Sequence, residues 1–126
     1  MRAVDTNILV RLTARDDPRQ TASAETFINE GAWVSTLALA EAIWVLARVY
    51  RRSADELADI VEVLLEHKDL TLQDADAVAD ALDVFRQRPA LGFSDCLLVA
   101  LARKAGHLPL GTFDRALAKV DGALKI

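Results

Sequence analysis

Four acidic residues differ from the other carboxylates of this 126-residue chain in their surroundings. Most of the 19 acidic residues recur on the polar faces of helical patterns, where solvent covers them. The four exceptions are Asp5, Glu41, Asp95 and Asp114. Three of them follow a predicted strand or begin a predicted helix, positions that line one end of an α/β sheet, and Glu41 interrupts an apolar helical run.

These four side chains suit the binding of a divalent metal ion. Clustered carboxylates repel one another, and each is driven toward its protonated form unless a cation lies between them. Mg²⁺ and Mn²⁺ prefer oxygen ligands and would remove this repulsion. Taken singly, each acid has an ordinary structural explanation, because aspartate often caps a helix and a helical glutamate is often exposed. Their joint placement favours a metal site.

The elements that must position these acids alternate between strand and helix. Short apolar strands are predicted at 3–4, 33–34, 70–72, 108–110 and 123–126, and helices at 8–13, 19–30, 37–51, 53–66, 74–88, 95–104 and 115–120. This alternation predicts an α/β fold with a parallel sheet covered by helices on both faces. We therefore expect a three-layer α/β/α arrangement with a central parallel sheet of about five strands, in a single domain over residues 1–126.

Local signals set the expected helix ends. Ser35 is a predicted N-cap, and Ser53 with Glu56 forms a capping-box pattern. Ser94 is a predicted cap for the helix that begins at Asp95, and Gly31 is a predicted C-cap.

Composition narrows the function classes. Hydrophobic residues make up 52% of the chain, and no apolar run reaches the roughly 18 residues that cross a membrane. No signal peptide is expected at the N-terminus, and the single cysteine, Cys96, fits a reducing cytoplasm and is expected in the core. The net charge of −4 is unlike that of a basic nucleic-acid binder. It does not exclude an enzyme that holds a phosphodiester with metal ions and a local basic rim.

The motifs around the four acids resemble those of the PIN domain family. The segments that carry the resemblance are Asp5-Thr6-Asn7, Leu39-Ala40-Glu41, Phe93-Ser94-Asp95-Cys96-Leu97-Leu98 and Thr112-Phe113-Asp114. They occur in the family's order and cover essentially the whole chain. The size and layout are similar to those of the VapC-type ribonuclease toxins of toxin–antitoxin pairs.

The resemblance implies a metal-dependent endoribonuclease in the cytoplasm. The four acids would hold one or two Mg²⁺ ions, with Mn²⁺ able to substitute, and Asn7 and Thr112 would orient the carboxylates. Basic residues near the motifs are candidates for contact with RNA phosphates, namely Arg11, Arg15 and Arg115. The resemblance also implies a homodimer and a VapB-like antitoxin held by apolar helices near 37–49 and 57–65.

The sequence is also compatible with other functions. A PIN nuclease could act in RNA processing or on DNA flaps without an antitoxin, and a non-catalytic interaction domain could keep the acids for structure. A phosphoaspartate receiver domain also places acids at strand ends. It normally needs a second acid beside the first one and a late lysine, which this chain does not offer at the required positions.

Overall fold

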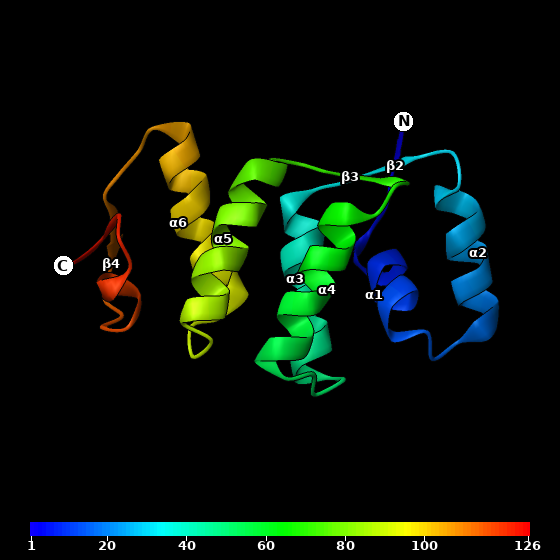
Figure 1. The fold of residues 1–126 in the computed structure, drawn as a ribbon, viewed down its shortest axis with the longest axis horizontal. Coiled ribbons are helices and arrows are strands. Elements are labelled where there is room, and N and C mark those ends of the chain that lie inside the picture. The colour runs from blue at the N-terminus through cyan, green and yellow to red at the C-terminus, as the bar shows by residue number, and fades with distance from the viewer. The chain divides into compact units, whose positions relative to one another are not determined.

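The computed structural model describes residues 1–126 and divides them into two compact units, Met1–Ala75 and Asp76–Ile126. The N-terminal unit contains β1 (Arg2–Ala3), α1 (Thr6–Ala14), α2 (Pro18–Ile28), β2 (Ala32–Val34), α3 (Thr36–Arg48), α4 (Ala54–Glu66) and β3 (Leu70–Leu72). The C-terminal unit contains α5 (Ala75–Gln87, whose first residue closes the N-terminal unit), α6 (Phe93–Ala105), β4 (Leu110–Thr112), the 3₁₀ helix η1 (Leu117–Lys119) and β5 (Ala123–Lys125). Figure 1 labels helices α1 to α6 and strands β2, β3 and β4.

The N-terminal unit is built on a three-stranded parallel sheet in the order β1-β2-β3. Side chains alternate along β2, where Ala32 and Val34 are buried while Trp33 is partly exposed. Beyond β1 the Val4 N–H donates to the Trp33 carbonyl oxygen at 3.1 Å, so the chain stays paired until the residue before Asp5. Asp5 therefore lies directly after the paired end of the first strand of the sheet.

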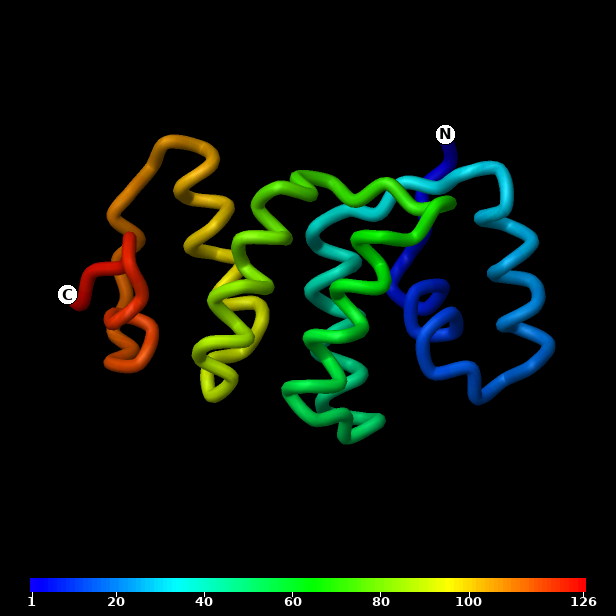
Figure 2. The backbone as a smooth tube through the Cα atoms, viewed as in Figure 1, coloured from blue at the N-terminus to red at the C-terminus, as the bar shows by residue number.

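Four helices complete the N-terminal unit. Helices α1 and α2 form a hairpin that Figure 2 traces in blue, and α1 also packs on α3. Leu9 of α1, Leu39 and Leu46 of α3 and Val61 of α4 are among its most deeply buried side chains. The predicted caps of two helices are confirmed: the Ser35 side chain accepts the Ala38 N–H, and Ser53 forms the expected capping box.

The C-terminal unit pairs two helices with a two-stranded parallel sheet, β4-β5. The buried residues of α5 and α6 include Val78 and Cys96, and the rings of Phe85 and Phe93 meet edge to face with centroids 5.9 Å apart. Gly106 ends α6 in the left-handed conformation at φ +82°, which glycine adopts without steric cost.

The α/β class with parallel strands is confirmed, and the chain has five strands as predicted. These strands form two hydrogen-bonded sheets, one of three strands and one of two. The expected single sheet of about five strands is therefore not observed. No helix has both the length and the apolar character needed to cross a membrane.

Several predicted boundaries were wrong. Ser94 does not cap α6, because the helix begins at Phe93, two residues before the predicted start at Asp95, and Gly92 holds the N-cap position. The fourth strand begins at Leu110 and not at 108, since Pro109 has no N–H to donate to a strand partner. Helix α2 ends at Ile28, so the predicted C-cap Gly31 lies in the following turn, and α3 ends at Arg48.

Candidate functional site

Asp5 lies between β1 and α1, where it caps the helix. Its backbone is extended, with φ −94° and ψ 180°, and its Oδ1 accepts the Ile8 N–H at 3.0 Å. Its other oxygen, Oδ2, accepts no hydrogen bond from the protein. The cap explanation and the metal-ligand prediction are therefore compatible, because each uses a different oxygen of the same carboxylate.

Glu41 lies in the second turn of α3 and is joined to the Asp5 motif through Thr6. The Thr6 hydroxyl donates to Glu41 Oε2 at 2.9 Å across 35 residues of sequence. Glu41 is exposed although its sequence neighbours are apolar, because Leu37 and Trp44, four residues before it and three after it, share its outward face and are themselves 68% and 57% exposed. Thr6 is the first residue of α1, after the N-cap Asp5, and its side chain binds the Glu41 carboxylate.

Asp95 lies in the first turn of α6, where its carboxylate is half-buried. Burial raises the pKa of this carboxyl above its usual range, and the negative charge of Asp114 raises it further. A negative charge in the first turn of a helix is stabilised by the helix dipole, and this partly offsets the rise in the pKa of Asp95. The two C-terminal acids are therefore close enough to repel each other.

Asp114 follows β4 and starts the turn that leads to η1. Its Oδ1 accepts the N–H groups of Ala116 and Leu117 at 2.8 and 3.1 Å, while Oδ2 accepts none. The Asp114 N–H donates to the Thr112 hydroxyl oxygen at 3.0 Å. Thr112 therefore fixes the backbone that carries the carboxylate, and it does not bond the carboxylate itself.

All four acids lack a basic partner. No lysine or arginine forms an ion pair with any of them, although other acids, such as Asp16 and Glu25, are paired in this way. Each of the four keeps at least one oxygen without a hydrogen bond. Asp5 and Glu41 belong to the N-terminal unit, and Asp95 and Asp114 to the C-terminal unit. Neither unit by itself gathers three or more histidine, cysteine, aspartate or glutamate side chains that could hold a metal ion.

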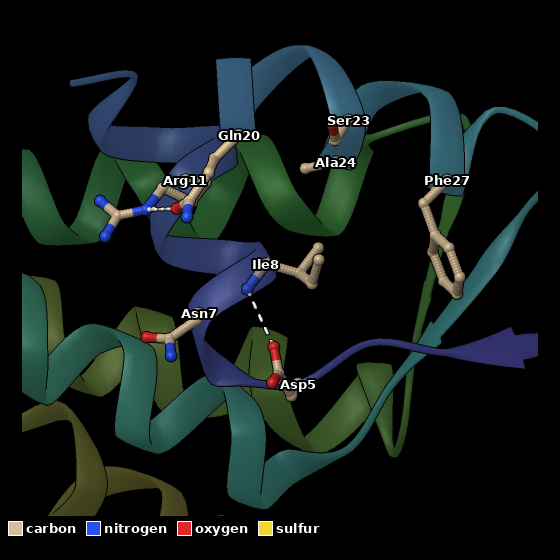
Figure 3. Close-up of a pocket in the computed structure, with 8 residues that line it drawn as sticks. All are labelled: Asp5, Asn7, Ile8, Arg11, Gln20, Ser23, Ala24 and Phe27. Carbon is tan, nitrogen blue, oxygen red and sulfur yellow. Dashed lines mark hydrogen bonds between the residues drawn. The ribbon is translucent and has the colours of Figure 1, made fainter. Parts of the chain in front are cut away.

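A groove beside Asp5 contains residues that the sequence did not single out. It lies between α1 and α2, has a volume of about 370 Å³, and is drawn in Figure 3. The residues that line it are Asp5, Asn7, Ile8, Arg11, Gln20, Ser23, Ala24 and Phe27. The side-chain amide of Asn7, predicted to orient a carboxylate, forms no hydrogen bond within the protein, and the residue lines this groove.

The three predicted phosphate-binding arginines have different surroundings. Arg11 donates to Gln20 Oε1 at 2.6 Å, to Asp16 Oδ1 at 2.8 Å and to the Tyr50 hydroxyl at 3.0 Å. Arg15 pairs with Glu25 at 2.7 Å. Arg115 is exposed, directly follows Asp114 and forms no ion pair. Arg115 is thus the one whose guanidinium is not engaged by an acid.

Sequence reasoning missed the residues that become neighbours only when helices pack. The groove positions 20, 23, 24 and 27 follow helical spacing on α2, so their shared face could have been read from the sequence. Nothing in the sequence placed that face against α1. The contact between Thr6 and Glu41 has no local signal at all, because it depends on the packing of α1 on α3.

The fold and the carboxylates together define an α/β protein with acidic groups at the ends of parallel strands and the starts of helices. The PIN domain family model matches residues 2–123, and the chain therefore belongs to the PIN domain family. PIN domains are typically metal-dependent nucleases. A comparison with curated proteins found no match.

Proposed function

We propose that this protein is a metal-dependent endoribonuclease whose two units make up one PIN domain. The family model spans both units, which supports a single domain over residues 1–126. The observation that carries the proposal is the state of the four motif acids. All are present, each keeps an oxygen without a hydrogen bond, and none has a basic partner.

The residues fit a hard divalent cation. Asp5, Glu41, Asp95 and Asp114 supply only carboxylate oxygens, the ligands that Mg²⁺ and Mn²⁺ prefer. When bound, such an ion lowers the pKa of a water molecule and stabilises the charge of a phosphodiester undergoing hydrolysis.

The protein's own contribution is to hold the carboxylates in place. The Ile8 N–H fixes one oxygen of Asp5, the Thr6 hydroxyl fixes one oxygen of Glu41, and two backbone N–H groups fix one oxygen of Asp114. These bonds restrict each side chain while leaving its second oxygen for the ion. Arg115, next to Asp114, is the best placed of the three arginines to contact an RNA phosphate.

We further propose that the nuclease is the toxin of a VapBC-like pair, with a VapB-like antitoxin as its partner, a cytoplasmic location and a homodimeric state. The size and order of the motifs support this assignment. A neighbouring small open reading frame that encodes a DNA-binding protein, and rescue of growth by that protein, are the expected observations. A gene without such a neighbour would favour a PIN nuclease of RNA processing or DNA-flap cleavage.

Cleavage of total RNA by the purified protein tests the enzymatic proposal. We expect discrete fragments with Mg²⁺ or Mn²⁺, none with EDTA, and none from the Asp95→Asn variant. Asp80→Asn is the matched control, because Asp80 is an exposed acid on α5 of the same unit. A folded wild-type protein that binds Mn²⁺ but cleaves neither RNA nor DNA would indicate a non-catalytic domain.

A further inference from the structure

The groove between α1 and α2 begins at one of the proposed metal ligands. Asp5 lies in its wall, and the carboxylate oxygen of Asp5 that caps α1 is fixed, so Oδ2 is the one left for an ion. Whatever binds in the groove therefore lies next to a group bound at the Asp5 carboxylate. Three other hollows of the N-terminal unit have walls that include none of the four acids, whereas Asp5 lies in the wall of this groove.

The walls of the groove combine apolar surface with a few polar groups. Figure 3 shows Ile8 of α1 and Phe27 of α2 on its two sides. The Arg2 guanidinium lies 3.8 Å from the centroid of the Phe27 ring and donates to the Phe27 carbonyl oxygen, which holds this side chain in position. The Asn7 amide and the Ser23 hydroxyl form no hydrogen bond within the protein. Apolar walls with a few unbonded polar groups are typical of a site for a flat organic ring.

Charge and size favour a single nucleoside over a second phosphate. The ionisable side chains that line the groove are Asp5 and Arg11, and Arg11 is already paired with Asp16 at 2.8 Å. The lining residues therefore offer another phosphate no cation without an acidic partner. A volume of about 370 Å³ is sufficient for one nucleoside.

We propose that this groove binds the base of one unpaired nucleotide of the RNA substrate, the nucleotide whose phosphate lies at the Asp5 carboxylate. This inference rests on the proposed ribonuclease function and adds where the substrate base is held. It also implies that the enzyme cleaves single-stranded segments, because a base must leave its stack and its partner to enter the groove.

Gln20 determines which bases fit. Its Oε1 accepts the Arg11 Nε–H at 2.6 Å, so its amide is oriented with the NH₂ group left as an unbonded donor. A donor favours a base edge that carries a carbonyl oxygen. Guanine, with its carbonyl at position 6, should therefore bind better than adenine, which has an amino group there.

Amide chemical shifts of the full-length protein test the proposal without relying on catalysis. Nucleoside 5′-monophosphates are titrated in Mg²⁺, with inorganic phosphate as the reference for binding at the carboxylates alone. We expect GMP to shift amides of α2 around Ser23, AMP to bind less tightly, and phosphate to leave these α2 amides unmoved. The Ile8 amide is hydrogen-bonded to Asp5 and should respond to both ligands, so it does not discriminate between them. Equal shifts of the α2 amides with GMP and phosphate, or no shifts on α2, would overturn the proposal.

A groove-filling variant provides the second test. Ser23→Trp places an indole at the exposed edge of the groove, and Thr26→Trp, on an exposed position of α2 outside the groove, is the matched control. We expect Ser23→Trp to lower kcat/KM for single-stranded RNA roughly tenfold, the loss that follows removal of one stacked base. Its Mn²⁺ affinity and thermal unfolding should equal those of Thr26→Trp.

The outcomes separate this inference from the proposed function. If wild-type protein cleaves RNA and Ser23→Trp cleaves it equally well, the groove does not hold a base and the nuclease assignment stands. If GMP binds in the groove but no RNA is cleaved, the base site stands and the nuclease assignment fails. Gln20→Leu should bind GMP and AMP alike; an unchanged preference for GMP would refute the role given to Gln20.

Discussion

Asp5 has two functions in this account, and substitution can separate them. Its Oδ1 caps α1 by accepting the Ile8 N–H at 3.0 Å, and its second oxygen is a proposed metal ligand. Asn caps a helix about as well as Asp, whereas Ala cannot cap it, so Asp5→Ala should lose about 1 kcal/mol of unfolding free energy while Asp5→Asn loses little. For a chain of this size the Ala variant should unfold about 4 °C lower.

Two measurements on the same three proteins check this reasoning. Thermal unfolding in EDTA should place Asp5→Asn near wild type and Asp5→Ala below both. RNA cleavage with Mn²⁺ should be lost in both variants, because neither retains the carboxylate. An Asn variant that unfolds as early as the Ala variant would refute the cap, and an Asn variant that cleaves at the wild-type rate would refute the ligand.

Three further predictions concern the core, the acid sensitivity and the cysteine. Leu39→Ala removes a side chain that is 1% exposed, and should lower the unfolding free energy by about 2–5 kcal/mol. Urea titrations measure this loss, and a loss below that range would mean that neighbouring side chains move in to fill the cavity. Hydrogen bonding from Tyr50, together with the charge of Arg11, lowers the pKa of Asp16. The ionised carboxylate therefore stabilises the fold at pH values above its unfolded-state pKa of about 4. This stabilisation is lost as the pH falls through the lower folded-state pKa. Wild type should therefore lose more stability than Asp16→Asn between about pH 5 and about pH 3, and equal losses would contradict the pairing. Burial raises the pKa of the Cys96 thiol to about 11, so thiol reagents at neutral pH should modify Cys96 only after unfolding, and Cys96→Ala should keep full nuclease activity.

The sequence was informative wherever a structure depends on neighbours along the chain. The capping box of Ser53 and Glu56 and the N-cap Ser35 involve residues three apart, and both were predicted correctly. The position of Asp5 between a strand and a helix was predicted for the same reason. Ser94 failed as a cap because any of several residues before an apolar run can hold that position, and Gly92 holds it here.

Contacts between distant segments could not be predicted in this way. The Thr6–Glu41 hydrogen bond, the groove between α1 and α2, and the binding of Arg11 by Tyr50 all depend on how helices pack. The division of five strands into sheets of three and two was missed for a similar reason, because alternation predicts strands but not their partners. The roles of the four acids came from their joint placement and from the family resemblance.

The Mn²⁺ dependence of RNA cleavage, measured on one variant from each unit, shows whether these carboxylates hold a catalytic metal ion. Metal-stripped wild-type, Asp5→Asn and Asp114→Asn proteins are titrated with Mn²⁺ on a single-stranded RNA, with Asp80→Asn as the control. We predict that cleavage by wild type and by the control rises to saturation with Mn²⁺ and that both ligand variants stay inactive at every concentration. Cleavage by metal-stripped wild type, or a full rate in either ligand variant, would contradict the claim that these carboxylates hold the metal of a ribonuclease.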